Sequence, residues 1–245
     1  LPLYSKVRRI WFNIWAMVRV IMRHFIKEHY DIIHIHGDFI EAYFGGWLSK
    51  ILGVPAMLTV HAGLNKRFLK PKNAYYFKNI KKIICVSEEI ANDLKNIGIP
   101  ENKIKVISSG INLIEFDNAK SESDEYKKEV SDLRNKYLGP ILISVGVLRI
   151  SKGFQYLIEA YKILEKKYFL LTLFILGDGS EYDNLKIKAG DSSRIYFLGR
   201  KNLSKHEEVI KYLKASDIFV LSSLDLPEDR EGTPTSIMEA MAAGL

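Results

Sequence analysis

The sequence contains one cysteine, Cys85, among its 245 residues, so the chain cannot form an internal disulfide. This excludes small domains held together by a disulfide framework, and it indicates a reducing compartment. Glycine and proline are also few, at 16 and 7 residues, which excludes collagen-like and low-complexity chains. Hydrophobic residues make up 47% of the chain, enough for one or two globular cores of ordinary size.

Long hydrophobic runs are missing from the sequence as well. Residues 7–25 carry apolar side chains at the helical spacing of three and four, but polar residues interrupt them well short of the roughly 20 residues that a membrane crossing needs. The stripe consists of Val7, Trp11, Ile14, Val18, Ile21 and Phe25. No small-residue cleavage site of a signal peptide follows. We therefore expect an amphipathic helix that does not span a membrane.

Two interpretations of this helix are open. Arg19, Arg23 and Lys27 recur at four-residue intervals and so share one face, while Trp11 and Trp15 are suited to a membrane interface. Peripheral contact with an anionic membrane is one interpretation. The other is a core helix that packs on a sheet and leaves its basic edge in water.

The charge balance is moderately basic. Lysine and arginine number 36 against 29 aspartates and glutamates, which gives a net charge of +7 and a pI of about 9.2. Such a charge invites nucleic acid, phospholipid or nucleotides, although a solvated basic surface explains it equally well. Since no RNA- or DNA-binding signature accompanies the charge, we expect no nucleic-acid partner.

Strand-like and helix-like segments alternate in two series, which predicts parallel sheets covered by helices. The predicted strands lie at 31–36, 54–61, 82–86, 103–107, 141–147, 170–176, 195–198 and 218–221. Helices are predicted at 39–52, 88–96, 154–166, 182–189, 206–214 and 234–243, with a basic loop and helix reaching residue 79. The fold class is therefore α/β, with two Rossmann-like domains in tandem.

A charged segment at 118–139 breaks this alternation and is helical only in its second half. We place a domain boundary there. The expected organisation is an N-terminal domain at 1–118, a linker with a helix at 119–139 and a C-terminal domain at 140–245. The chain starts at Leu1 without a methionine and ends at Leu245 directly after a helical pattern, so we expect a fragment that is incomplete at both ends.

In doubly wound sheets, ligands bind at the carboxyl ends of the strands, so the loops after the strands are where chemistry is expected. Residues 146–153 (GVLRISKG) combine two glycines with Arg149 and Lys152 before a helix, which is typical of a phosphate site. A solvated Lys152 in a first turn explains the pattern equally well. In 176–179 (LGDG), Asp178 could accept from a ligand hydroxyl, although a plain turn is the simpler interpretation.

The segment 231–244 (EGTPTSIMEAMAAG) is the most informative. Thr233 is a plausible N-cap with Pro234 at the first helical position, which leaves first-turn N–H groups unpaired. These N–H groups belong to Thr235, Ser236 and Ile237. Glu239 lies inside the helix among apolar residues, where it needs a partner; sugar hydroxyls would serve. A partly exposed helix residue and an ordinary loop acid are the simpler interpretations of Glu239 and Glu231.

Three histidines, His34, His36 and His61, lie at or near strand ends of the first half. A metal site would need further ligands, and no spaced carboxylate accompanies them. We therefore expect no metal, and we take His61 as the best candidate for a ligand contact across a cleft.

Taken together, these motifs resemble the retaining glycosyltransferases of family 4, which have the two-domain GT-B fold. The resemblance covers nearly the whole chain and is most specific in the pair Glu231 and Glu239, separated by seven residues within EGTPTSIMEAMAAG. The other matching segments are 31–37 (DIIHIHG), 58–63 (LTVHAG), 85–94 (CVSEEIANDL), 106–112 (VISSGIN), 144–153 (SVGVLRISKG), 176–181 (LGDGSE), 196–200 (YFLGR) and 215–223 (ASDIFVLSS).

The resemblance implies a hexosyltransferase that moves a sugar from a nucleotide-diphosphate-sugar donor, with retention and without an obligatory metal or cofactor. The implied acceptor is a polysaccharide, lipid-linked or cell-envelope glycan, and the implied location is the cytoplasm, at the inner face of the membrane. Glu231 and His61 would meet the donor sugar, Glu239 the ribose and Lys152 the diphosphate. The remaining donor-binding residues would be Gly146, Arg149, Gly177, Asp178, Gly232, Thr233, Thr235 and Ser236.

Two positions depart from the family pattern. Val147 stands where the family usually has arginine, leaving Arg149 as a displaced substitute, and Ser109-Gly110 replaces the usual Asn-Gly. The alternatives to an active enzyme are a catalytically inactive fragment and a basic module that binds membranes or nucleic acid. Stabilisation by nucleotide diphosphates would separate the donor-binding interpretation from the binding module.

Overall fold

The computed structural model describes residues 3–26, 29–117, 123–199 and 206–245, and it divides into two compact units. The first unit comprises Leu1–Ser109 and Leu226–Thr233, and the second comprises Gly110–Asp225 and Pro234–Leu245. Lys27 and the last residue of the matching segment 196–200 lie outside the described residues, as do residues 118–122 of the expected boundary. The domain limits at 118 and 139 therefore stay predictions.

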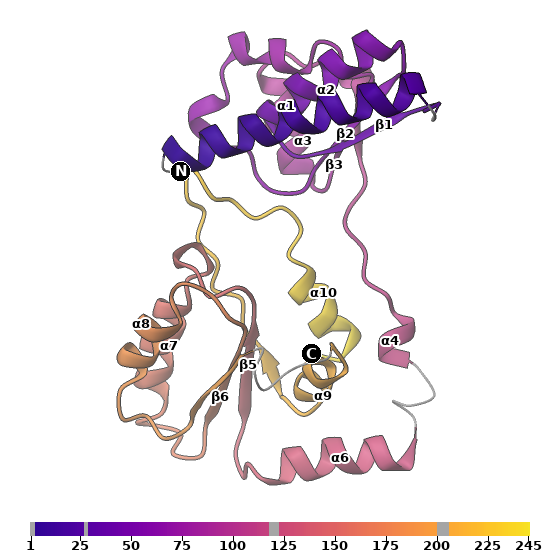
Figure 1. Cartoon of the computed structure of the whole chain (residues 1–245). Coiled ribbons are helices and arrows are strands. Elements are labelled where there is room, and N and C mark those ends of the chain that lie inside the picture. Colours follow the sequence, from indigo (N-terminus) through magenta and orange to yellow (C-terminus); the bar gives the residue numbers. More distant parts are fainter. Residues whose placement is uncertain (1–2, 27–28, 118–122, 200–205) are drawn as a thin grey trace. The chain divides into compact units, whose positions relative to one another are not determined.

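A four-stranded parallel sheet forms the centre of the first unit, with the strand order β1-β2-β3-β4 (Figure 1). The strands are β1 (Ile33–His36), β2 (Ala56–Val60), β3 (Lys82–Cys85) and β4 (Ile104–Val106). Its helices are α1 (Leu3–Ile26), α2 (Phe39–Leu52) and α3 (Glu88–Asn96), with the short 3₁₀ helices η1 (Lys66–Phe68), η2 (Pro71–Phe77) and η3 (Glu101–Lys103). The helix expected before residue 79 is thus a pair of 3₁₀ helices.

Local sequence signals determine where these helices begin and end. Asp38 caps α2 by accepting from the Ile40 N–H, and Glu41 accepts from the Asp38 N–H, which completes a capping box. Gly53 ends α2 in the left-handed conformation, which favours glycine. Ser87 caps α3 by accepting from the Ile90 N–H.

Apolar side chains from one face of the sheet make the core of the first unit, together with apolar residues of α2 and α3. Leu58, Ile83 and Cys85 are fully buried in this core. Burial raises the pKa of the Cys85 thiol to about 11. The thiol is therefore a small apolar core group and not a reactive one.

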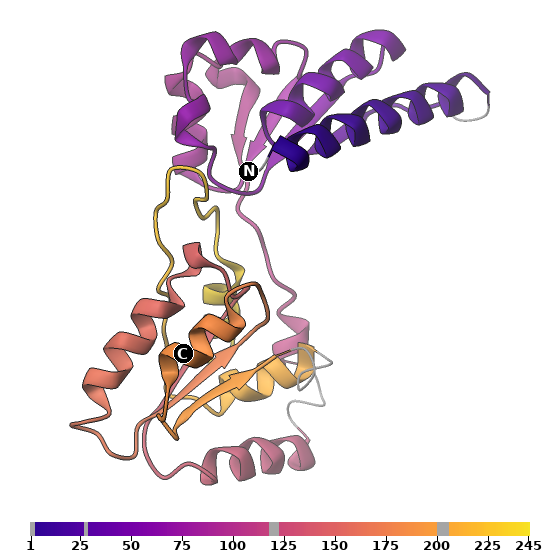
Figure 2. The same ribbon diagram turned by 60° about the vertical axis from the view of Figure 1, so that its left-hand side comes forward.

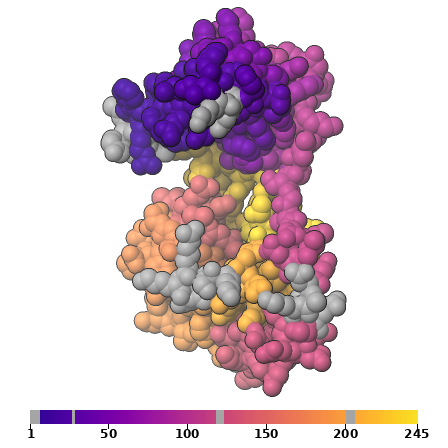
Figure 3. Space-filling view, turned by 45° about the vertical axis from the view of Figure 1, so that its right-hand side comes forward, coloured from indigo at the N-terminus to yellow at the C-terminus, as the bar shows by residue number. Residues whose placement is uncertain are grey.

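Helix α1 has α2 as its principal neighbour, and the two helices lie side by side in both ribbon views (Figures 1 and 2). The interpretation of this helix as one packed mainly on a sheet was therefore wrong, because its main contact is with another helix. Many of its apolar side chains are exposed, and Figure 3 shows α1 in indigo at the surface of its unit. Trp11 is 66% exposed and Trp15 60% exposed.

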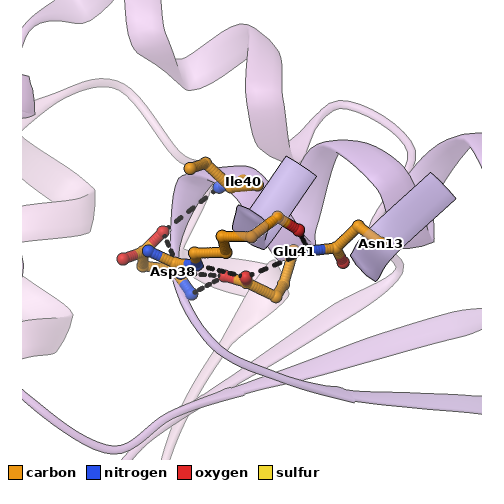
Figure 4. Close-up of polar contacts among 5 residues, drawn as sticks. Asn13, Asp38, Ile40 and Glu41 are labelled. Carbon is orange, nitrogen blue, oxygen red and sulfur yellow. Dashed lines mark hydrogen bonds and ion pairs between the residues drawn. The ribbon is translucent and has the colours of Figure 1, made fainter. Parts of the chain in front are cut away.

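A cluster of charged side chains joins α1 to the start of α2 (Figure 4). Arg9 donates through Nε to Oε1 of Glu41 at 2.5 Å and pairs with Asp38 at 2.9 Å. Asn13 donates to Oε1 of Glu41 at 3.3 Å. Burial raises the pKa of the Glu41 carboxyl, but the Arg9 hydrogen bond and the Asp38 N–H outweigh burial, so the net pKa is lowered. Glu41 therefore closes the capping box and binds α1 at the same time.

The second unit contains another four-stranded parallel sheet, with the order β7-β6-β5-β8. The strands are β5 (Ile141–Val145), β6 (Thr172–Leu176), β7 (Ile195–Leu198) and β8 (Ile218–Phe219). The helices are α4 (Ile114–Asp117), α6 (Asp124–Asn135), η4 (Ile150–Lys152), α7 (Phe154–Leu164), α8 (Tyr182–Ala189), α9 (His206–Lys214) and α10 (Thr235–Ala242). Two apolar clusters, one on each side of β5 and β6, form its core. The prediction of two Rossmann-like domains is confirmed.

Replacing Glu41 by Gln should destabilise the first unit, because Arg9 loses a partly buried charged partner. We expect a loss of about 1–3 kcal/mol in the free energy of unfolding at pH 7, measured by urea denaturation. The folded-state pKa of Glu41 lies below its ordinary value of 4.5, so its contribution is present above pH 4.5 and is lost as the pH falls through the lowered pKa.

Glu88→Gln serves as the matched control, since Glu88 is an exposed first-turn glutamate of α3. The difference in stability between the two variants should shrink in acid. A constant difference from pH 7 to pH 3 would contradict the role given to the Glu41 carboxylate.

Candidate functional site

Strand β5 marks the point in the second sheet where the chain reverses its direction of growth. The chain adds β6 and then β7 on one side of β5, and afterwards places β8 on the other side. Ligands of doubly wound sheets bind at such a switch point, outside the carboxyl ends of the strands. The loops after β5 and β8 are therefore the expected ligand-binding loops of this unit.

Backbone hydrogen bonds hold the glycines of these loops in line with the sheet. The Gly146 N–H donates to the Leu176 carbonyl at 2.9 Å, and the Gly177 N–H donates to the Leu198 carbonyl at 3.0 Å. These bonds extend the ladders between β5 and β6 and between β6 and β7 beyond the strand ends. The two predicted glycines therefore lie at adjacent strand ends.

Lys152 lies in the loop that follows β5, where this loop meets the loop that follows β8. It ends η4 directly before Gly153, and its carbonyl accepts from Oγ of Ser222 at 2.9 Å. Gly153 has φ of 67° and a Cβ there would meet the Ser222 carbonyl oxygen at 1.9 Å, so only glycine fits. Helix α7 begins at the next residue, which places the backbone of Lys152 at a helix N-terminus. This arrangement suits a phosphate group.

The other donor-side residues of the β5 and β6 loops have simpler settings. Asp178 accepts from the Gly179 N–H at 2.8 Å, while its own carbonyl accepts from Leu148 N–H at 2.9 Å. The side chain thus caps a turn. Arg149, at the N-cap position of η4, is exposed, and Val147 is 58% exposed. An arginine at position 147 would have room at this surface.

Glu239 has a partner that the sequence did not indicate. Its Oε1 lies 3.4 Å from Nε2 of His206, and Nδ1 of the same imidazole bonds Oε2 of Glu115 at 2.7 Å. The hydrogen bond with His206 is the main cause of the lowered pKa of Glu115. The Glu239 side chain is 18% exposed. The helix residue that we expected to bind ribose is therefore held by a histidine of α9.

Residues 226–233 pair with the first unit, although both their chain neighbours belong to the second. Gly63 and Arg230 form an antiparallel bridge, in which the Gly63 N–H donates to the Arg230 carbonyl at 3.1 Å. A Cβ at Gly232 would come within 2.2 Å of the His61 carbonyl oxygen, so the backbones of Gly232 and His61 touch. Glu231 is thereby held beside the loop that follows β2.

The predicted N-cap at Thr233 was wrong. Helix α10 begins at Thr235 with Pro234 at the cap position, and no side chain caps it. Thr233 instead donates its hydroxyl to the Val86 carbonyl at 2.5 Å. The Ile237 N–H is bonded to the Pro234 carbonyl at 3.2 Å, so it is not among the unpaired donors. The threonine hydroxyl serves the first unit because its residue lies in the segment that pairs there.

The three predicted histidines are neighbours at the carboxyl edge of the first sheet. His36 Nδ1 and His61 Nε2 share a hydrogen bond of 2.7 Å, and His34 Nε2 bonds the Thr59 hydroxyl at 2.8 Å. Burial lowers the pKa of His34, and the nearby His36 and His61 lower it further. Within the described part of the chain, no group of three or more His, Cys, Asp or Glu side chains could hold a metal ion. The expectation of metal-independent chemistry stays a prediction.

Arg230 is the main residue that sequence reasoning missed. It is 6% exposed, and its guanidinium bonds Asp93 at 2.5 Å and also bonds Glu89. Both carboxylates come from one face of α3, four residues apart. The signal in the sequence that could have indicated the contact is this pair of acids on one helix face, taken together with the arginine directly before Glu231.

The family comparison agrees with these two halves. Residues 1–115 match the family model described as Glycosyltransferase Family 4, and residues 123–245 match the model described as Glycosyl transferases group 1. The chain belongs to the group 1 glycosyl transferases. Membership of this family confirms the resemblance seen in the sequence.

This glycosyl transferase chain is similar to several curated relatives. It is 30% identical to an Escherichia coli UDP-Gal:alpha-D-GlcNAc-diphosphoundecaprenol alpha-1,3-galactosyltransferase, covering 89% of this chain and 57% of the relative. It is also 30% identical to a Campylobacter jejuni N,N'-diacetylbacillosaminyl-diphospho-undecaprenol alpha-1,3-N-acetylgalactosaminyltransferase, covering 92% and 62%. The chain thus spans little more than half the length of these curated relatives.

The fold is shared with Anabaena HepE in complex with UDP, at a TM-score of 0.70 and 20% identity, over 93% of this chain and 61% of that one. It is also shared with an Escherichia coli trehalose-6-phosphate protein bound with UDP-2-fluoro glucose, at a TM-score of 0.72 and 16% identity, over 94% and 60%. At these identities the likeness shows the fold alone.

Replacing Lys152 by Ala should weaken the binding of a nucleoside diphosphate, because the cation at the start of α7 is removed. We expect a loss of up to about 3 kcal/mol in binding free energy, measured by calorimetry with UDP and GDP. Lys166→Ala is the matched control, since Lys166 is an exposed lysine after the far end of α7. Equal affinity of the Lys152 variant and the wild type would move the role to Arg149 or refute the site.

Proposed function

We propose that this chain is the part of a retaining glycosyltransferase that binds a nucleotide-diphosphate sugar and transfers its hexose to a lipid-linked or polysaccharide acceptor. The observation that carries the proposal is the setting of Lys152, at a helix start in the loop after the switch-point strand β5, in a member of this family. The two relatives named above, which act on diphospho-undecaprenol-linked sugars, favour a lipid-linked acceptor.

In this proposal each part of the signature has its own task. Lys152 neutralises the diphosphate as it leaves the anomeric carbon, which is the largest electrostatic demand of the reaction. Gly146, Arg149, Gly177 and Asp178 line the same strand ends. Thr235 and Ser236 offer first-turn N–H groups of α10 to the distal phosphate or sugar, together with the backbone of Gly232 and Thr233.

Glu239 binds the ribose hydroxyls in this proposal, and His206 holds its carboxylate in place. Glu231 and His61 act on the donor sugar. No metal or cofactor is required, because a lysine and helix N–H groups supply the positive charge. Transfer proceeds at the cytoplasmic side of a membrane, where a free thiol such as Cys85 stays reduced.

The two glutamates should separate in their kinetic effects. Glu239→Gln should mainly raise the Michaelis constant for the nucleotide sugar, since its partner is the ribose. Glu231→Gln should mainly lower the single-turnover rate while nucleotide affinity survives, as expected for a contact made chiefly in the transition state.

This comparison is made in the complete protein, with nucleotide affinity and single-turnover rate measured for both variants. Glu159→Gln, an exposed change on α7, is the control. The proposal fails if both signature variants stay within about twofold of wild type, which is less than roughly 0.5 kcal/mol.

We also infer that α1 binds an anionic lipid surface peripherally. No helix among the described residues is long and apolar enough to cross a membrane. The exposed apolar face of α1 nevertheless includes Trp11, Trp15 and Phe25, with Arg19 and Arg23 exposed nearby. Aromatic rings beside guanidinium groups are typical of helices that lie in a membrane interface.

The double variant Trp11→Ser/Trp15→Ser should lose binding to vesicles that contain phosphatidylglycerol, because the rings that enter the interface are gone. A cosedimentation assay should show at least a tenfold loss, while pure phosphatidylcholine vesicles bind neither protein well. Phe169→Ser, a change at an exposed aromatic residue of the second unit, should bind as the wild type does. Undiminished binding of the double variant would overturn this proposal.

A further inference from the structure

The segment 226–233 is held by the first unit along its length and not at one point. Besides the bridge between Gly63 and Arg230, the Lys66 N–H donates to the Pro227 carbonyl at 2.8 Å. The Thr233 hydroxyl bonds the Val86 carbonyl at the far end of the segment. The segment therefore runs along the loops after β2 and β3, with a backbone hydrogen bond near one end and a side-chain hydrogen bond at the other.

Arg230 is the one deeply buried side chain among the charged residues of the described segment 226–233. Its guanidinium bonds two carboxylates of α3, and it also donates to the Leu64 carbonyl at 3.4 Å. A buried guanidinium is costly to desolvate unless charged partners and acceptors surround it. The ion pairs therefore stabilise the position of segment 226–233 that the structure shows, relative to any position in which Arg230 loses its partners.

The two carboxylates differ in their surroundings. Asp93 is 18% exposed, whereas Glu89 is 62% exposed. Attraction is screened less at the more buried of the two, so the Asp93 contact should contribute more to holding the segment. We therefore expect loss of the Asp93 carboxylate to weaken the hold on the segment more than loss of the Glu89 carboxylate.

Arg230 directly precedes residues that the proposed function places at the donor sugar. Glu231 is the next residue, and the backbone of Gly232 touches the carbonyl of His61. Fixing the Arg230 side chain in α3 therefore fixes the backbone of both residues that follow it. None of the proposed donor contacts uses the Arg230 guanidinium itself.

We propose that Arg230 is a positioning residue, which locks the loop of Glu231 and Gly232 against the β2 loop at His61 through its ion pairs with Asp93 and Glu89. This inference rests on the proposed function for its catalytic meaning, but the anchoring itself is a property of the first unit. Loss of the anchor leaves nucleotide binding in the second unit intact and removes the alignment of Glu231 needed for transfer.

The first experiment follows hydrogen exchange of the Gly63 and Lys66 amides, both of which donate to the segment. Their exchange should be slow in the wild type and at least about tenfold faster in Arg230→Gln. Arg230→Lys should give an intermediate rate, because an ammonium cannot reproduce the two-sided contact of a guanidinium. This experiment needs no enzymatic activity, so it stands even if the proposed function fails.

The second experiment measures UDP affinity and single-turnover transfer in the complete protein. Arg230→Gln should lower the transfer rate at saturating donor by at least about tenfold, with UDP affinity within about twofold. A merely structural role would lower both together or neither. Asp93→Asn should follow Arg230→Gln more closely than Glu89→Gln does.

Glu88→Gln is the matched control for both experiments, since it removes an exposed charge of α3 next to Glu89. If Arg230→Gln does not fold, as judged by circular dichroism, Asp93→Asn and Glu89→Gln carry the same test. Rapid exchange of both amides in the wild type would overturn the anchor. Slow exchange with an unchanged transfer rate in the anchor variants would overturn the positioning role while leaving the anchor in place.

Discussion

Parallel pairing of the strands is the constraint from which the placement of the functional loops follows. In each of the two sheets, every strand runs in the same direction, so every strand ends at the same edge. Loops far apart in sequence, such as those around His36 and His61 or around Gly146 and Gly177, are thereby brought together. The helical crossovers that parallel pairing requires also supply helix N-termini at that edge, such as the start of α7 beside Lys152.

Most of the fold could be predicted from the sequence because its signals are local and periodic. Helix α2 was predicted from residue 39 to 52 because its apolar pattern is helical and Gly53 closes it, and the structure has the helix at Phe39–Leu52. The strands were predicted a little too long, as with 170–176 against β6 at Thr172–Leu176, because the apolar run begins before the first residue of the strand. The 3₁₀ helices were not distinguished, since their short runs have no period that separates them from loops.

The site was predictable only in the residues that act through their local backbone. Lys152 and its glycines follow from a strand, a loop and a helix start that are contiguous in sequence. The contacts of Arg230 with α3 and of Glu239 with His206 join residues far apart, and neither periodicity nor composition carries that information. Thr233 was assigned to the wrong partner for the same reason, because the competing Val86 carbonyl is distant in sequence.

The chain passes from the first unit to the second between Glu231 and Glu239, so the two glutamates belong to different units. The backbone of Glu231 is held by hydrogen bonds and an ion pair of the first unit, up to Thr233. Glu239 lies on α10, whose neighbouring Ala240 is buried in the core of the second unit. Pro234 is the first residue of the second unit after this point, and it occupies the N-cap position of α10. Of the pair Glu231 and Glu239, one residue therefore belongs to each unit. A substitution that destabilises the core of one unit leaves the glutamate of the other unit supported.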